Sequence, residues 1–203
     1  MKKQLLDLIL GIEVTGDLHK DVFRLLSMDG NKELEEHTIK VAYEAERIAR
    51  LYDISEEKAF TAGLLHDIGK LIPLHRRIDI CNYFGVHEYE EERLVPSMLH
   101  PKLSRIIADN FFQVDAEICN AVECHSTLKA NASKLDLVLF IADKVSWPRT
   151  HNEGFIIGML DGLDVSLECS AIKFLEYIHS GHAEVIHPWA KESYEYLKEI
   201  CKK

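Results

Sequence analysis

A histidine and an aspartate stand side by side in the apolar stretch AGLLHDIGK, which covers residues 62–70. Burying an imidazole and a carboxylate among such residues costs on the order of several kcal/mol unless another group compensates. A divalent metal ion would compensate, because it binds a ring nitrogen of His66 and neutralises the carboxylate of Asp67. The stretch therefore indicates a metal site.

Four more residues of ligand type lie on an apolar face or at the ends of apolar stretches. His37 falls in phase with the apolar side of its segment, and Asp143 follows the run LVLFIA. His100 ends the stretch SMLH, and His125 ends the stretch AVECH. Each has an ordinary explanation when taken singly: a satisfied core histidine, a surface or capping histidine, or an acid paired with a neighbouring lysine or arginine.

Taken together, these residues form a more specific pattern. Four histidines and two carboxylates suit two divalent ions bridged by a shared carboxylate, with open positions for water. Ligands without sulfur disfavour a structural zinc site and suit iron first, or manganese, while cobalt and zinc share the same ligands. The predicted metal ligands are His37, His66, Asp67, His100, His125 and Asp143.

The elements that must bring these residues together are helices nearly everywhere. Residues 32–52 place apolar side chains on one stripe and charges opposite, and Ser55 is a suitable N-cap for a helix that Gly69 can end. Further helices are expected near residues 75–84, 101–112, 115–125, 133–146, 164–180 and 188–202, with caps at Asp115 and Ser133. Because no convincing run of alternating β-branched residues occurs, the predicted fold class is all-α, a compact bundle.

The composition narrows the class of protein. At 203 residues, with 47% hydrophobic and 29% charged residues, the chain is typical of a globular domain. A formal net charge of −10 argues against nucleic acid as a partner, because phosphates require a basic face. No apolar run is long enough to span a membrane, and five scattered cysteines without a CxxC pair favour reduced thiols in a cytoplasm.

The chain also resembles a known family. The order H…HD…D is similar to that of the HD-domain metal-dependent phosphohydrolases, and the additional histidines resemble their dinuclear branch. Five segments resemble the bacterial YqeK family of symmetrical diadenosine tetraphosphate hydrolases: HTIKVAYEAERIA (37–49), LLHDIGK (64–70), ECHST (123–127), FIADKVSWPR (140–149) and IHPWAKESYEYL (186–197). The likeness implies an HD domain over residues 31–203, preceded by a helical extension over residues 1–30.

The resemblance implies a role for each ligand. His37, His66, Asp67 and Asp143 would hold one ion, and His100 and His125 would hold the second with Asp67 as the bridge. Asp67 and Lys70 would be catalytic, and the substrate-binding residues would be Lys70, Ser126, Thr127 and Arg149. A hydroxide formed from metal-bound water would cut diadenosine tetraphosphate, a small nucleotide, into two ADP.

The chain departs from the family pattern at two places. Residues 126–129 read STLK, where the family commonly has threonine, a small residue, glycine and arginine, and Trp147 replaces an acid. These changes leave the ligands intact but affect substrate choice, so an HD nucleotidase or phosphodiesterase of different range stays an alternative. A silent nucleotide- or metal-sensing module is another, and a homodimer is a candidate assembly. His87 is an alternative to His100, because Pro101 follows His100 directly.

Overall fold

The computed structural model describes residues 11, 14–147 and 153–202. Within these residues every regular element is a helix and no strand occurs, which confirms the predicted all-α class. The α-helices are α2 (Leu18–Asp29), α3 (Lys32–Leu51), α4 (Glu56–Leu65), α5 (Arg77–Phe84), α6 (Glu90–Leu94), α7 (His100–Ile107), α8 (Ala116–Cys124), α9 (Lys134–Val145), α10 (Glu153–Gly162), α11 (Leu167–Tyr177) and α12 (Pro188–Ile200). Short 3-10 turns are η1 (Ile68–Leu71), η2 (Leu74–Arg76) and η3 (Pro96–Leu99), and π-helical turns are η4 (Ala108–Phe112) and η5 (Ile178–His182).

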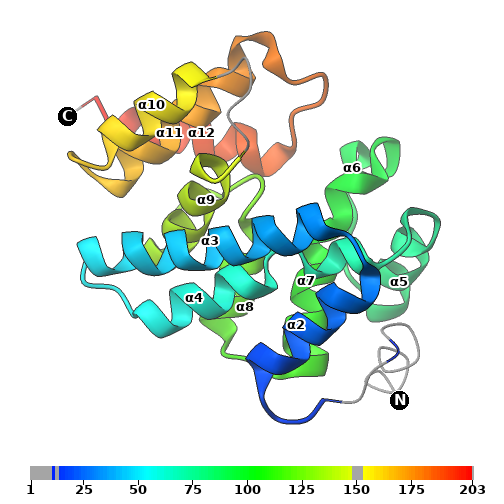
Figure 1. Ribbon diagram of the computed structural model, residues 1–203. Coiled ribbons are helices and arrows are strands. Elements are labelled where there is room, and N and C mark those ends of the chain that lie inside the picture. Colours follow the sequence, from blue (N-terminus) through cyan, green and yellow to red (C-terminus); the bar gives the residue numbers. More distant parts are fainter. Residues whose placement is uncertain (1–10, 12–13, 148–152, 203) are drawn as a thin grey trace.

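The arrangement is built around the pair α3 and α4 (Figure 1). These two helices run side by side across the middle of the molecule, and both also contact α9. α9 leads from this pair to α10, α11 and α12, which form a layer of their own at the top of the view. α5 and α6 lie on the opposite side of the molecule from α10. No helix of the described residues is both long and apolar enough to cross a membrane.

Two close approaches between backbones set the geometry around residues 66 and 67. A Cβ atom at Gly63 would lie 2.4 Å from the Cα of Ala42, so glycine lets α4 pack directly against α3. A Cβ atom at Gly69 would lie 2.3 Å from the carbonyl oxygen of His100, which brings η1 against α7. The absence of a side chain at both positions draws α3, α4 and α7 around one point.

Most of the predicted helices form, but several boundaries differ. α4 ends at Leu65 and not at Gly69, because the chain tightens into η1, where the Gly69 N–H donates to Ser104 Oγ (2.9 Å). The helix expected over 101–112 divides into α7 and η4, and α6 and α10 were not predicted. Ser55 and Ser133 cap their helices as expected. Asp115 does not, since its side chain makes no capping bond and lies 3.3 Å from Lys58 Nζ instead.

The expected extension over residues 1–30 includes α2. Asp17 caps this helix, and Val22, Leu25 and Leu26 are buried in the same apolar core as the rest of the chain. Residues 1–10 and 12–13 lie outside the described residues. The division of the chain at residue 30 stays a prediction.

Candidate metal centre

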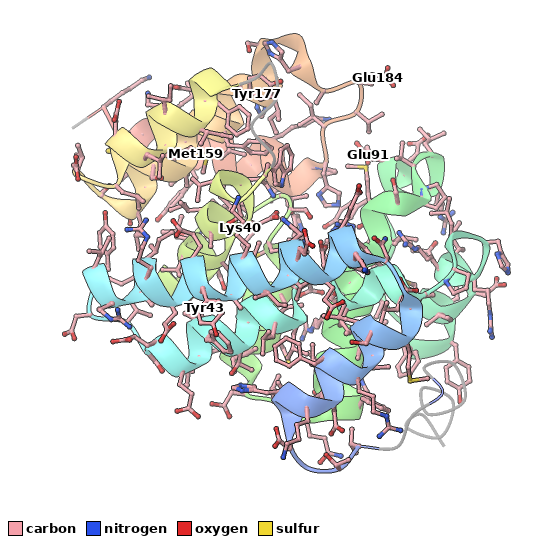
Figure 2. All side chains as sticks on the ribbon, in the orientation of Figure 1. Lys40, Tyr43, Glu91, Met159, Tyr177 and Glu184 are labelled. Carbon is pink, nitrogen blue, oxygen red and sulfur yellow. The ribbon has the colours of Figure 1, made fainter. Side chains whose placement is uncertain are left out.

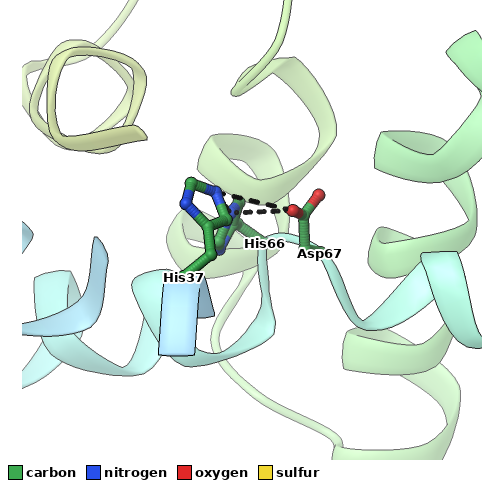
Figure 3. A group of neighbouring side chains, drawn as sticks. All are labelled: His37, His66 and Asp67. Carbon is green, nitrogen blue, oxygen red and sulfur yellow. Dashed lines mark hydrogen bonds and ion pairs between the residues drawn. The ribbon is translucent and has the colours of Figure 1, made fainter. Parts of the chain in front are cut away.

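The structure brings all six predicted ligand residues into one cluster. His37 comes from α3, His66 and Asp67 from the end of α4, and Asp143 from α9. His100 begins α7 and His125 follows α8. Figure 3 shows His37 and His66 both directed at Asp67. Five helices therefore converge on the point that the two close backbone approaches create.

Asp67 lies at the middle of the cluster and divides it into two groups. Its Oδ2 lies 3.2 Å from His66 Nε2 and 3.7 Å from His37 Nε2. Its Oδ1 lies 3.2 Å from His100 Nε2 and 3.6 Å from His125 Nε2. We call His37, His66, Asp143 and Asp67 Oδ2 the first group, and His100, His125 and Asp67 Oδ1 the second group. One carboxylate thus faces two pairs of imidazoles with different oxygens.

Asp143 completes the first group from α9. Its Oδ1 lies 3.1 Å from His37 Nε2 and 3.8 Å from His66 Nε2. Lys144 Nζ donates to Asp143 Oδ2 (2.5 Å) and to the carbonyl oxygen of His125 (3.2 Å). The ordinary explanation of Asp143, pairing with a neighbouring lysine, and its predicted place among the metal ligands therefore occur together, through different oxygens.

The second nitrogen of the histidine rings fixes their orientation. A ring nitrogen that donates to a backbone carbonyl leaves the lone pair of the other nitrogen for a ligand. Such bonds run from the Nδ1 atoms of His66 to Gly63 O (2.7 Å), of His100 to Ser97 O (2.8 Å) and of His125 to Val122 O (2.8 Å). The three Nε2 atoms consequently present lone pairs to the centre of the cluster.

The cluster fits divalent cations. The Nε2 atoms of His100 and His125 lie 3.2 Å apart, and two facing lone pairs repel each other unless a proton or a cation lies between them. Asp67 Oδ1 is buried and accepts no hydrogen bond, which is costly for a carboxylate oxygen. Two sets of donor atoms are close enough to bind one ion each: His37, His66 and Asp67, and Asp67, His100 and His125.

The pKa values of the buried groups suit metal binding. Burial raises the pKa of Asp67, but the neighbouring imidazoles of His66, His100 and His125 outweigh it and hold the pKa well below its ordinary value. Burial lowers the pKa of His125 to about 4. At neutral pH, Asp67 is therefore ionised and His125 neutral, and these are the protonation states that bind a cation.

Three of the predicted substrate-binding residues, Lys70, Ser126 and Thr127, lie in or beside this cluster. Lys70 Nζ contacts Asp67 Oδ2 (2.5 Å). Ser126 Oγ lies 3.1 Å from His125 Nε2 and 3.2 Å from His100 Nε2, and Thr127 follows it along the chain. Arg149 lies outside the described residues. His87 is not part of the cluster: its carbonyl oxygen accepts from Lys102 Nζ, and its ring packs against that of Tyr89.

Two hollows flank the cluster. The first has a volume of about 580 Å³, and its polar lining includes Asp29, Asn31, Glu36, His37, Lys40 and Lys70. The second has a volume of about 560 Å³, a more apolar lining, and is bounded by Lys70, Leu74, Met98, His100, Ser126 and Thr127. Lys70 and one histidine of the cluster border each hollow, so the metal groups lie between them.

Two buried cations near the cluster were not expected from the sequence. Arg77 is buried and donates to the carbonyl oxygens of Lys70, Ile72 and Ser97. Lys144 is 2% exposed, with its Nζ about 5 Å from three aromatic rings. The helical spacing could have predicted that both residues lie on a buried face. Arg77 precedes the buried pair Ile80 and Cys81 by one helical turn, and Lys144 follows Phe140 by one turn.

The chain belongs to the HD domain family, whose pattern matches residues 34–147. It is thus an HD-domain hydrolase, of a class that depends on metal ions. It is 42% identical over 141 residues to an uncharacterized protein in the pepC 5′ region of Lactococcus lactis subsp. cremoris, a match that covers 69% of this chain and 72% of that protein. These findings confirm the resemblance to HD-domain phosphohydrolases.

Two further relatives bear on the branch of the family. A symmetrical bis(5′-nucleosyl)-tetraphosphatase of Staphylococcus aureus is 28% identical over 121 residues, which cover 56% of this chain and 59% of that protein. A crystal structure from Clostridium acetobutylicum, of a predicted HD superfamily hydrolase involved in NAD metabolism, is 27% identical with a TM-score of 0.81. The match covers 91% of this chain and 98% of the Clostridium acetobutylicum chain. Both matches support the resemblance of this chain to the YqeK family.

Proposed function

We propose that this protein hydrolyses nucleoside polyphosphates, and that its reaction is the symmetrical cleavage of diadenosine tetraphosphate into two ADP. The observation that carries the proposal is the position of Asp67, whose two oxygens face two imidazole pairs between two hollows. A substrate with a nucleoside at each end of a polyphosphate suits a centre with a hollow on each side. The similarity to the Staphylococcus aureus enzyme supports the same substrate class.

The proposed ligands follow the two groups. His37, His66, Asp67 and Asp143 would hold one ion, and His100, His125 and Asp67 the other. Two divalent ions supply Lewis acidity to phosphoryl oxygens and lower the pKa of water when they are bound. Iron is the first candidate, with manganese, cobalt and zinc as alternatives for the same nitrogen and oxygen donors.

Lys70 would act on the phosphates. In the described structure its ammonium group neutralises Asp67 Oδ2, the oxygen that the first group directs at a cation. A cation bound there would compete for the same oxygen, and the Lys70 side chain, which is 41% exposed, would then face the polyphosphate. A lysine in that place stabilises the charge that develops on the phosphoryl oxygens. The diphosphate leaving group needs little protonation, so no dedicated general acid is required.

The two hollows would bind different parts of the substrate. The apolar side chains of Leu74 and Met98 in the second hollow suit a nucleobase. The first hollow carries Asp29 and Glu36, whose carboxylates accept hydrogen bonds from ribose hydroxyls but repel phosphate. The polyphosphate would therefore lie across the metal groups, and not within the first hollow.

Product analysis tests the proposal. Protein loaded with iron or manganese should convert diadenosine tetraphosphate into ADP alone. ATP and AMP as products would place the attack away from the central bridge and would overturn the assignment. An Asp67→Asn variant, assayed in parallel, controls for contaminating phosphatases.

One observation favours a second candidate, an HD nucleotidase or phosphodiesterase of different range. Ser126 and Thr127, in the segment that departs from the family pattern, line the second hollow, and Leu128 turns the chain there with a positive φ of 58°. A hollow whose lining differs from that of the family would accept a different nucleotide. A panel of dinucleotides, including dinucleotides of nicotinamide, compared by kcat/KM, separates the two candidates. Binding without turnover of any member would instead indicate a sensor.

A further inference from the structure

The motif IHPW at residues 186–189 has no part in the proposed reaction, yet its histidine is buried. His187 is the N-cap of α12, and its Nδ1 accepts a hydrogen bond from the Trp189 N–H (3.1 Å). The proton of the neutral ring is therefore on Nε2, which donates to Glu92 Oε1 (3.3 Å). The start of α12 is thus bonded to α6.

Glu92 joins this histidine to α7. Its Oε2 accepts from Lys102 Nζ (2.6 Å), and Lys102 Nζ also donates to the carbonyl oxygen of His87 (2.7 Å). We call His187, Glu92 and Lys102 the buried triad, since each is at most 5% exposed. Trp189 adds a parallel link, because its Nε1 donates to Tyr89 Oη (2.9 Å).

The buried triad holds both ends of the segment that carries His100, one histidine of the second group. Glu92 precedes that segment, and Lys102 follows His100 in the first turn of α7. Between them lies Ser97, whose carbonyl oxygen orients the His100 ring. The segment that carries His125, the other histidine of the second group, is also tied to α12. Ser193 Oγ donates to the carbonyl oxygen of Thr127 (3.3 Å).

The first group has no such support from α12. Among the described residues, no side chain of α12 bonds to His37, His66 or Asp143. Their helices are held instead by apolar packing around α3, α4 and α9.

We propose that the buried triad is a positioning device for His100, and that it sets the affinity of the second metal group while leaving the first unchanged. This inference rests on the proposed two-ion centre. Residues that orient metal ligands commonly change metal affinity by ~10- to 100-fold when they are removed. The triad acts through the backbone of residues 93–101, and none of its members needs to touch an ion.

Two substitutions at residue 187 separate the triad from the helix cap. Asparagine offers an acceptor in place of Nδ1 and is a preferred N-cap, but it is too short to reach Glu92. Glutamine has an amide N–H near the position of Nε2 and keeps the donor to Glu92. Lys191→Ala is a matched control, because Lys191 Nζ joins α12 to Glu91 of α6 across 3.7 Å at the surface. Glu91 is labelled in Figure 2.

Titration of the metal-free full chain with Mn²⁺ is the measurement. The wild type should bind two ions, and His187→Asn should raise the dissociation constant of one ion by ~10- to 100-fold with the other unchanged. His187→Gln should stay within about 3-fold of the wild type, and so should Lys191→Ala, a surface pair. His187→Gln as weak as His187→Asn would show that the donor to Glu92 does not account for the effect and would overturn the proposal, as would wild-type binding by His187→Asn.

Two other results remain decisive. A wild type that binds fewer than two ions would overturn the proposed two-ion centre itself, before any variant is compared. If His187→Asn does not fold, Trp189→Phe decides, because it keeps the aromatic packing and removes only the donor to Tyr89. It should weaken the same ion by about 3-fold, as expected for one hydrogen bond, and an unchanged affinity would overturn the proposal.

Discussion

The two halves of the metal cluster are built differently. The first group is carried by α3, α4 and α9, helices whose apolar faces form the centre of the core. The second group stands on short elements, η3, the first turn of α7 and the end of α8, and the segment that carries His100 is held by the buried triad. Apolar packing of long helices positions ligands cooperatively, whereas a polar network depends on each of its members. The second group should therefore be the easier one to lose.

Asp67→Asn should have the largest effect, because it removes the charge that both halves share. The amide keeps the shape but compensates the repulsion of two dications poorly. We expect hydrolysis below detection and a lower metal content per chain, with the helical fold largely retained. Metal analysis, circular dichroism and a product assay on one preparation check this. Full metal content with near-normal turnover would make Asp67 an ordinary core acid and would remove the basis for comparing two halves.

Lys70→Ala should have the next largest effect. Lys70 borders both hollows but is a ligand of neither group, so both ions should remain. Losing one charge that stabilises the phosphoryl oxygens should lower kcat by roughly 10- to 1000-fold. Steady-state kinetics with metal analysis separate this outcome from that of Asp67→Asn. Loss of an ion in Lys70→Ala would show that the lysine supports the cluster and not the substrate.

The same difference between the halves explains what the sequence predicts well. His37 and Asp143 repeat in phase with the apolar residues of α3 and α9, so helical periodicity identifies their faces. Gly69 was assigned to a helix end, because a glycine after an apolar run is a common stop signal, whereas its role is the contact with the His100 carbonyl oxygen. That contact joins segments far apart in the chain, and local pattern cannot predict it.

Buried charges were the harder part for the same reason. A lysine or arginine is usually solvated, and only its partners reveal otherwise. Arg77 and Lys102 are buried because carbonyl oxygens and a carboxylate from other segments surround their charged ends. Such partners are set by tertiary structure, so a sequence pattern can predict candidate ligands for the second group but not the network behind them.

The halves should also differ in their response to pH in the metal-free protein. Burial lowers the pKa of His125 to about 4, from an ordinary value of 6.5. Between these values the unfolded chain binds a proton that the folded chain does not, so stability falls as the pH is lowered. His66 does not contribute in this range: burial lowers its pKa, but the Asp67 charge outweighs burial, and the net pKa lies above 6.5. Its stabilisation is complete below 6.5 and is lost only as pH rises through the raised pKa.

The expected slope from His125 is about 1.4 kcal/mol per pH unit. The pKa values of Asp67 and Asp143 lie well below 3.8, so their contribution is lost only at more acidic pH. Denaturant unfolding of metal-free protein between pH 6.5 and 4 measures the slope, and His125→Gln should reduce it by that amount. An unchanged slope in this variant would mean that His125 titrates normally and that the second group is more open to water than its burial indicates.

The smallest effect is expected from a pair of serines, one in each half. Ser126 Oγ lies within 3.2 Å of both imidazoles of the second group, whereas Ser146 Oγ is buried beside the first hollow without a hydrogen-bond partner. Ser126→Ala should lower kcat/KM by about 3- to 10-fold, the worth of one hydrogen bond, with both ions bound. Ser146→Ala removes an unsatisfied hydroxyl and should leave kcat/KM unchanged and the unfolding free energy equal or higher. Paired kinetic and unfolding measurements test both. Equal losses of activity would mean that Ser146 also contacts the substrate. The difference between a polar second half and an apolar first half would then hold for the metal ligands but not for the residues that bind the substrate.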